Sequence, residues 1–146
     1  MMRVISYGGG VQSTALCVLA VQGKIGKVDA ALFANVGDDS EHPATCSYVR
    51  EQMLPWCAER GLDVHELHRV KRDGSRETLM ENLLRPASRA INIPVRMPDN
   101  GAPGNRNCTE TFKILVIRRW LRSHGVTKNA PATVLVGFST DEIHRV

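Results

Sequence analysis

The sequence predicts a Rossmann-like α/β fold, in which three layers (α/β/α) are built around a parallel sheet of about five strands. Three observations lead to this prediction. Short apolar stretches alternate along the chain with stretches whose apolar residues recur at helical spacing. The stretch from Val28 to Ala34 is continuously apolar after Asp29, which is typical of a strand buried on both faces. Polar segments follow the strands, at the edge where such sheets bind ligands.

The first predicted strand leads through a glycine loop into a helix. Arg3 to Ser6 is a β-type run, and Gly8 to Gly10 follow it after one residue. From Val11 onward apolar residues recur at helical spacing, and Gly23 and Gly26 supply the stop signals. The order of elements is therefore strand, glycine loop and helix.

The remaining chain repeats this alternation. A polar turn follows the second strand, and residues 44–60 have helical spacing that Pro55 should kink. Residues 62–67 alternate apolar with polar, as a third strand does. We then expect a helix over 75–84, a long loop over 86–107, a helix over 109–123 and a strand over 133–138.

The composition is that of a globular protein, with 42% hydrophobic and 23% charged residues in 146. We expect one domain, residues 1–146, and the sequence leaves open whether a C-terminal portion or a partner chain completes it. Neither a signal pattern nor an apolar run of about 18 residues is present, so we expect a cytoplasmic protein that does not contact a membrane. The four cysteines form no CxxC pair, which predicts thiols: Cys17, Cys46, Cys57 and Cys108.

The net charge of +4 favours anionic ligands. Basic residues form two small groups, at 69–76 and 118–122. Each group is either a solvated face or a contact to phosphate or nucleic acid, and no aromatic residues alternate with the charges.

The glycine loop has the properties of a phosphate site. Glycines allow positive φ and close approach of the backbone, and the first amides of the following helix favour an anion. Ser13 and Thr14 add hydroxyl groups at the start of that helix. The spacing excludes GxxxxGK[ST], because no lysine precedes Ser13, and it also excludes GxGxxG.

Residues 6–14, Ser-Tyr-Gly-Gly-Gly-Val-Gln-Ser-Thr, resemble the SGGxDS pyrophosphate loop (PP-loop) of the adenine nucleotide α-hydrolase family, whose fold is of the HUP type. Three later segments resemble its phosphoadenosine phosphosulfate reductase branch. Residues 33–39 with Pro43 and Thr45 are similar to "DTG…PET", residues 107–109 with Lys113 to a cysteine-then-lysine segment, and residues 137–142 with Arg145 to "G…DE..R". Gly8 and Gln12 depart from the loop pattern, since they replace a serine and an acidic residue.

The resemblance implies an enzyme that binds ATP, lets a substrate attack the α-phosphate and releases pyrophosphate, in connection with sulfur transfer. The acceptor would be nucleic acid or a small molecule. The implied nucleotide-binding residues are Ser6, Gly8, Gly9, Gly10, Gln12, Ser13, Thr14, Asn35, Val36 and Arg145, and the implied catalytic residues are Cys108, Lys113 and Asp141.

Magnesium would bind Asp38 and Asp141, since Mg²⁺ prefers one or two carboxylates together with phosphate oxygens. Cys108 lies just before a predicted helix near basic residues, a setting that favours the thiolate. Thr109 stands where cluster-bearing relatives have a second cysteine, so we predict no iron–sulfur cluster.

Two alternatives stay open. A reductase of sulfated adenylate is disfavoured because the chain ends at Val146 without a terminal cysteine motif. A nucleotide-binding module without catalysis, completed by a protein partner or a second copy, is favoured by Gly8 and Gln12. Release of pyrophosphate would separate the enzyme from the module.

Overall fold

The computed structural model describes residues 1–86, 93, 95–96, 101 and 107–141. In these residues a parallel sheet has the strand order β3-β2-β1-β4. The α/β class and the parallel sheet are thus confirmed, with four strands in the described residues instead of about five. The strands are β1 (Arg3–Tyr7), β2 (Ala30–Asn35), β3 (Val64–His68) and β4 (Thr133–Val136).

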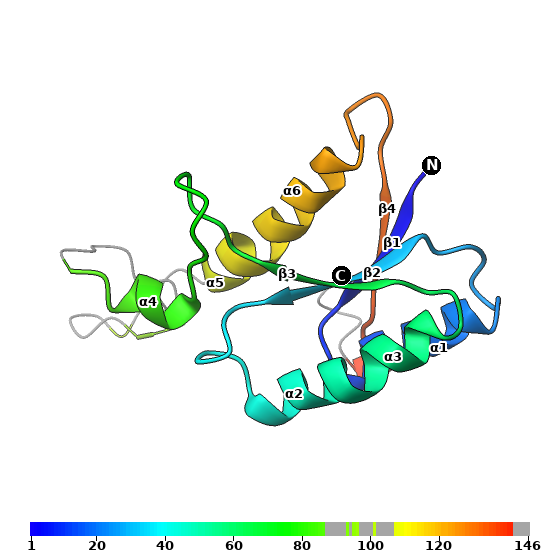
Figure 1. Ribbon diagram of the computed structural model, residues 1–146, viewed down its shortest axis with the longest axis horizontal. Helices are drawn as coiled ribbons and strands as arrows, with labels where there is room; N and C mark the ends of the chain where they lie inside the picture. The colour runs from blue at the N-terminus through cyan, green and yellow to red at the C-terminus, as the bar shows by residue number, and fades with distance from the viewer. Residues whose placement is uncertain (87–92, 94, 97–100, 102–106, 142–146) are drawn as a thin grey trace.

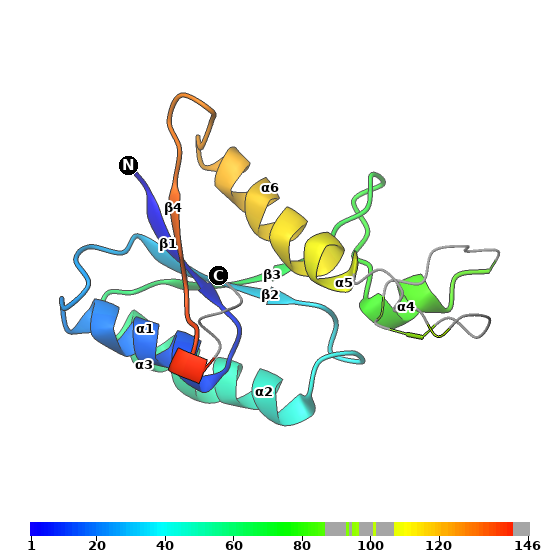
Figure 2. The same cartoon turned by 180° about the vertical axis from the view of Figure 1, so that it is seen from behind.

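Helices cover both faces of the sheet (Figures 1 and 2). One face of β1 and β2, with Ile5 and Phe33, packs against α1 (Val11–Val21) and the helix over residues 43–58. The other face, with Val4 and Leu32, packs against α6 (Leu115–Ser123). Every residue of β2 is buried, as its uninterrupted apolar run predicts.

The helix after β2 contains a π-helical turn before its proline. Its parts are α2 (Pro43–Tyr48), η1 (Val49–Met53) and α3 (Leu54–Ala58). The Leu54 amide donates to the Val49 carbonyl, which widens the turn. Pro55 therefore lies in the first turn of α3, where its missing N–H and fixed φ are tolerated.

Two other elements differ from the prediction. The helix expected over 75–84 is only α4 (Leu79–Leu83), because residues 75–77 pair with the strand end at 69–71 instead. Thr78 caps α4 in a capping box with Glu81. The last strand ends at Val136 rather than at 138.

The helix expected over 109–123 begins earlier, as α5 (Asn107–Thr109) and η2 (Glu110–Ile114), which lead into α6. Most of the long loop expected over 86–107 lies outside the described residues. No helix in the described ranges combines the length and the apolar character that a membrane span requires.

Candidate functional site

The loop between β1 and α1 depends on glycine at position 9. Gly9 has φ 75°, and a Cβ added there would lie 2.7 Å from Thr45 Cγ2 and 3.3 Å from Val49 Cγ2. Side chains of the helix over residues 43–58 thus lie directly against the loop backbone. Gly8 differs, since it has no positive φ and no atom within 4 Å of an added Cβ.

The hydroxyl group of Ser13 holds this loop together. It donates to the Gly10 carbonyl over 3.1 Å and accepts from the Gly8 amide over 3.2 Å. The Thr14 hydroxyl lies 3.4 Å from the hydroxyl of Tyr7, whose pKa burial raises to about 12. In this structure both hydroxyl groups are engaged inside the protein.

The first turn of α1 has free amide donors. Gly10 precedes the helix with an extended backbone, and no side chain caps it. Within the described residues, the amides of Val11, Gln12 and Ser13 have no acceptor. These groups carry the partial positive charge of the helix end, so they favour an anion there.

A cavity of about 290 Å³ lies at the carboxyl ends of β1, β2 and β4. The register Tyr7↔Phe33 and Ser6↔Val136 brings these ends together. Six of the predicted site residues line the cavity: Ser6, Gly8, Gly10, Gln12, Ser13 and Lys113.

Five further residues, which no sequence motif assigned to the site, line this cavity. They are Tyr7, Ala34, Ile117, Val136 and Gly137. A Cβ added to Gly137 would lie 2.8 Å from the carbonyl carbon of Gln12, so the chain just after β4 approaches the first turn of α1 as closely as only glycine allows. Gly137 is the glycine of the "G…DE..R" segment, which was the available sequence signal for this contact. For Ile117 the available signal was its position one helical turn after Lys113.

Lys113 reaches this cavity from the opposite helical layer. It belongs to η2, and its Nζ lies 3.8 Å from Glu41 Oε2. This Glu41 oxygen is buried and accepts no hydrogen bond, so the ion pair is long and incompletely satisfied. Lys113 thus lines the same cavity as the start of α1, and its ammonium group is paired only at long distance with Glu41.

Asp38 is held in a polar cluster that ties the ends of β2 and β3. The guanidinium of Arg50 donates to both carboxylates, Asp38 and Glu66, with distances from 2.6 to 3.1 Å. The Asn35 amide donates to the same two side chains over 2.8 and 2.7 Å and accepts from the Gly37 amide. The hydrogen bonds from Arg50 and then Asn35 lower the pKa of Asp38 to about 2.

This cluster engages two residues that were predicted to bind ligands. The side-chain groups of Asn35 are used inside the protein, and the Asp38 carboxylate is already bound by Arg50, which also pairs with Glu66. The Val36 carbonyl accepts from the Leu79 amide over 2.8 Å. Any contact of a nucleotide base with this segment would therefore use the remaining backbone positions.

The other predicted residues that the structure describes do not line the cavity. Asp141 is exposed, and a hydrogen bond from Ser139 lowers its pKa. The turn after β2 and the segment after β4 lie apart in both ribbon views (Figures 1 and 2). Among the described residues, no group of three His, Cys, Asp or Glu side chains could hold a metal ion.

Cys108 lies in α5 and is partly exposed. The sequence predicted Cys108 just before a helix, whereas the structure places it inside the first helical segment, and Cys108 is not among the residues that line the cavity. Arg145 lies outside the described residues.

Comparisons of this chain with protein-family models, with curated proteins and with solved structures found no match.

Proposed function

We propose that the cavity beside the glycine loop binds the phosphates of ATP, and that the protein adenylates a substrate by its attack on the α-phosphate with release of pyrophosphate. One observation carries this proposal. The start of α1, with its free amides, and Lys113 from the opposite layer line the same cavity at the carboxyl edge of a parallel sheet. Amides at a helix start and a nearby ammonium group are the usual partners of phosphate oxygens.

The size of the cavity suits part of a nucleotide. Its volume of about 290 Å³ is at the small end of ligand sites, which span roughly 300–1,000 Å³. We therefore assign the phosphates to the cavity and the nucleoside to the adjoining surface along the end of β2. This orientation keeps the α-phosphate near the mouth of the cavity, where a substrate oxygen can reach it.

The protein's part in such a reaction is alignment and charge stabilisation. Attack on a phosphate needs donors fixed where negative charge develops. The α1 amides and Lys113 would hold the oxygens of the leaving pyrophosphate, while Gly8 and Gly10 leave the backbone open to close approach. A link to sulfur transfer rests on the resemblance of the segment that contains Cys108.

The residues predicted for magnesium do not fit a metal site at this cavity. The Asp38 carboxylate is bound by Arg50 and Asn35, and Asp141 does not line the cavity. We therefore derive no step through a metal ion.

A second candidate function is binding of an adenine nucleotide without catalysis. The observation that favours it is the binding of the Asp38 carboxylate by Arg50, together with Gln12 at the loop position that is acidic in the resembling family. In this case the site has phosphate donors, but neither Asp38 nor Asp141, the two carboxylates predicted for magnesium, lines the cavity. A pyrophosphate assay on the ATP-bound protein, with candidate acceptors, separates the two functions.

The first experiment is calorimetric titration of ATP into the wild type and into Lys113→Gln, with and without Mg²⁺. Lys24→Gln is the matched control, because Lys24 is an exposed lysine outside the cavity. We expect ATP to bind the wild type and the control equally, and Lys113→Gln at least about tenfold more weakly. GTP and adenosine 5′-phosphosulfate serve as comparators.

A preference for the sulfated adenylate would favour the reductase over the adenylating enzyme. Equal ATP affinity of the wild type and Lys113→Gln would contradict the assignment of the phosphates to this cavity. Absence of any nucleotide binding would contradict the proposed function as a whole.

A further inference from the structure

A second cavity lies on the other side of the helix that carries Lys113. Its volume is about 480 Å³, and it lies between the end of β3, a hairpin over residues 70–76 and the helix formed by η2 and α6. Thr111 and Leu115 line this cavity, whereas Lys113 and Ile117 line the cavity beside the glycine loop. One helix therefore separates the two cavities.

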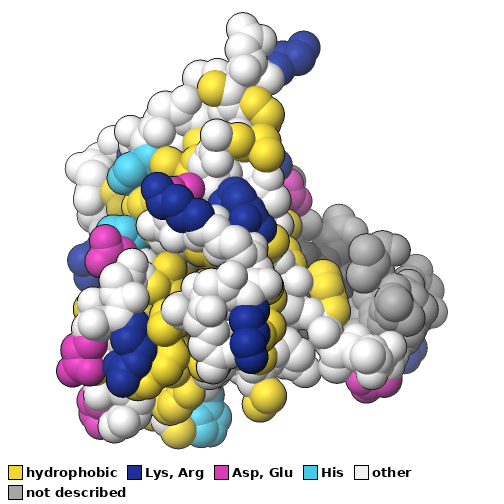
Figure 3. All heavy atoms as spheres, turned by 90° about the vertical axis from the view of Figure 1, so that its right-hand side faces the viewer, with side chains coloured by type: hydrophobic (Ala, Val, Ile, Leu, Met, Phe, Trp, Pro, Cys, Tyr) yellow, Lys and Arg dark blue, Asp and Glu magenta, His cyan; other side chains and the backbone are white. Residues whose placement is uncertain are grey.

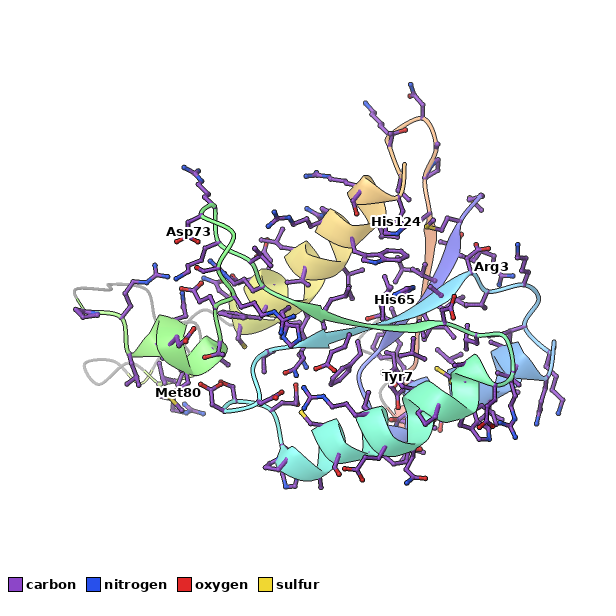
Figure 4. The ribbon with its side chains drawn as sticks, in the orientation of Figure 1. Arg3, Tyr7, His65, Asp73, Met80 and His124 are labelled. Carbon is purple, nitrogen blue, oxygen red and sulfur yellow. The ribbon has the colours of Figure 1, made fainter. Side chains whose placement is uncertain are left out.

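This second cavity joins the two basic groups that stand apart in the sequence. Arg69 and Arg76 come from the hairpin group, and Arg119 comes from α6. The Arg119 guanidinium donates to the Val70 carbonyl over 3.1 Å, which fixes the helix against the hairpin. Figure 4 shows the hairpin, marked by Asp73, beside α6, which His124 follows.

Among the described residues, most of the cations in these two groups have no carboxylate partner. Arg69 pairs with Glu77, which also binds Arg85, and Glu66 is bound by Arg50. Asp73, the remaining acidic residue of the hairpin, accepts hydrogen bonds from the amide and the hydroxyl group of Ser75. In the part of the chain that the structure describes, no ion pair involves Lys71, Arg72, Arg76, Arg118, Arg119 or Arg122.

The charge pattern here differs from that of another face. On the face in Figure 3, basic groups are separate, with acidic and hydrophobic side chains between them. At the second cavity, by contrast, Arg76 and Arg119 line one site, and further basic residues of the hairpin and of α6 adjoin them in the sequence. An extended anion matches such a group of cations better than a single small ion does, since it contacts several cations at once.

The floor of the cavity is apolar, with Leu67, Leu115 and Val116. Trp120 also lines it, but its ring stacks on His124 at 3.7 Å and lies 5.2 Å from His65. Trp120 is therefore an apolar wall rather than a free stacking platform. Contacts to phosphates, which do not depend on base sequence, would dominate binding.

From these observations we infer that the second cavity and its basic rim bind a single strand of nucleic acid through its phosphates. Arg76 and Arg119 contact phosphates at the rim, and a sugar or base lies against the apolar floor. The inference deepens the proposed function by naming the class of acceptor. It rests on that function for the acceptor role, but not for the binding itself.

The test is fluorescence anisotropy with a labelled 20-nucleotide single-stranded DNA, in the absence of ATP and over a series of salt concentrations. The variants are Arg76→Gln and the double variant Arg76→Gln/Arg119→Gln. The control is Lys24→Gln/Lys128→Gln, which removes the same charge from exposed lysines outside the cavity. Arg76→Gln alone guards against a folding defect, because Arg119 also holds the hairpin.

We expect the arginine double variant to bind DNA at least about tenfold more weakly than the lysine control. The slope of log K against log salt should fall by about 1.4, since each lost phosphate contact on a single strand contributes about 0.7. Lys113→Gln should keep its DNA affinity while it loses ATP affinity, which separates failure of this inference from failure of the nucleotide site. Equal weakening in the arginine and lysine pairs would overturn the inference.

Two further outcomes would overturn it as well. One is tighter binding of poly-L-glutamate than of DNA at equal charge, which would indicate an acidic polypeptide partner. The other is binding of inorganic phosphate without binding of DNA, which would indicate a small anion.

Discussion

Replacement of Gly9 by alanine tests whether the loop geometry is built on close contact with the neighbouring helix. Gly9 has φ 75°, a conformation that costs a residue with a Cβ about 1–2 kcal/mol. The added methyl group would also lie 2.7 Å from Thr45 Cγ2, and overpacking of this kind costs about 1–3 kcal/mol. We therefore expect Gly9→Ala to lower the free energy of unfolding by about 2–5 kcal/mol.

The two contributions can be separated with a second substitution. Thr45→Ser removes the Cγ2 atom that the new methyl group would meet, but it leaves the backbone strain unchanged. In a double-mutant cycle we expect Thr45→Ser to recover about 1–2 kcal/mol of the loss in Gly9→Ala. Gly8→Ala is the matched control and should change the free energy of unfolding by less than about 1 kcal/mol, because nothing lies within 4 Å of its added Cβ.

The assay is urea unfolding followed by circular dichroism, with ATP titration of each folded variant. A loss in Gly9→Ala no larger than that in Gly8→Ala would refute the reasoning about φ and contact. If Gly9→Ala lowers the free energy of unfolding by the full amount and Thr45→Ser recovers none of it, only the reasoning about the Thr45 contact is refuted. Weaker ATP binding in the folded Gly9→Ala variant would connect the loop geometry to the proposed function.

Two further predictions concern the strand ends. Gly137→Ala should weaken ATP binding at least about tenfold, because its Cβ would lie 2.8 Å from the Gln12 backbone and displace the first turn of α1. Calorimetric titration of ATP measures the affinity. An unchanged affinity would show that the chain after β4 does not shape the site. Arg50→Met should flatten the acid dependence of stability. The folded-state pKa of Asp38 is about 2, below its ordinary value of 3.8, so this carboxylate stabilises the fold above pH 3.8 and the contribution disappears as the pH falls through 2. Urea midpoints at pH 5 and pH 2.5 should therefore differ less in Arg50→Met than in the wild type, and an equal difference would contradict the role of the guanidinium.

The sequence by itself determined the local elements and the class of the fold. Helical and strand spacings are local properties, and they predicted the strands and most helices to within a few residues. The continuous apolar run of β2 required a strand covered on both faces, as the structure has it. The order of β1, glycine loop and α1 was equally local, because glycines after a strand and before a periodic segment set the turn.

Only the tertiary structure decided which distant side chains meet. Lys113 joins the loop cavity because η2 packs across β2. The register of β2 and β3 sets Glu66 opposite Phe33, and from there the Glu66 carboxylate accepts hydrogen bonds from both Asn35 and Arg50. The helix expected at residue 75 begins at Leu79, since pairing with residues 69–71 satisfies the backbone of 75–77. Two basic groups nearly fifty residues apart in the sequence meet where Arg119 donates to the Val70 carbonyl, and both contribute arginines to one cavity. Charge and propensity are carried by each residue, but partners follow from strand register and helix placement, which no short stretch of sequence contains.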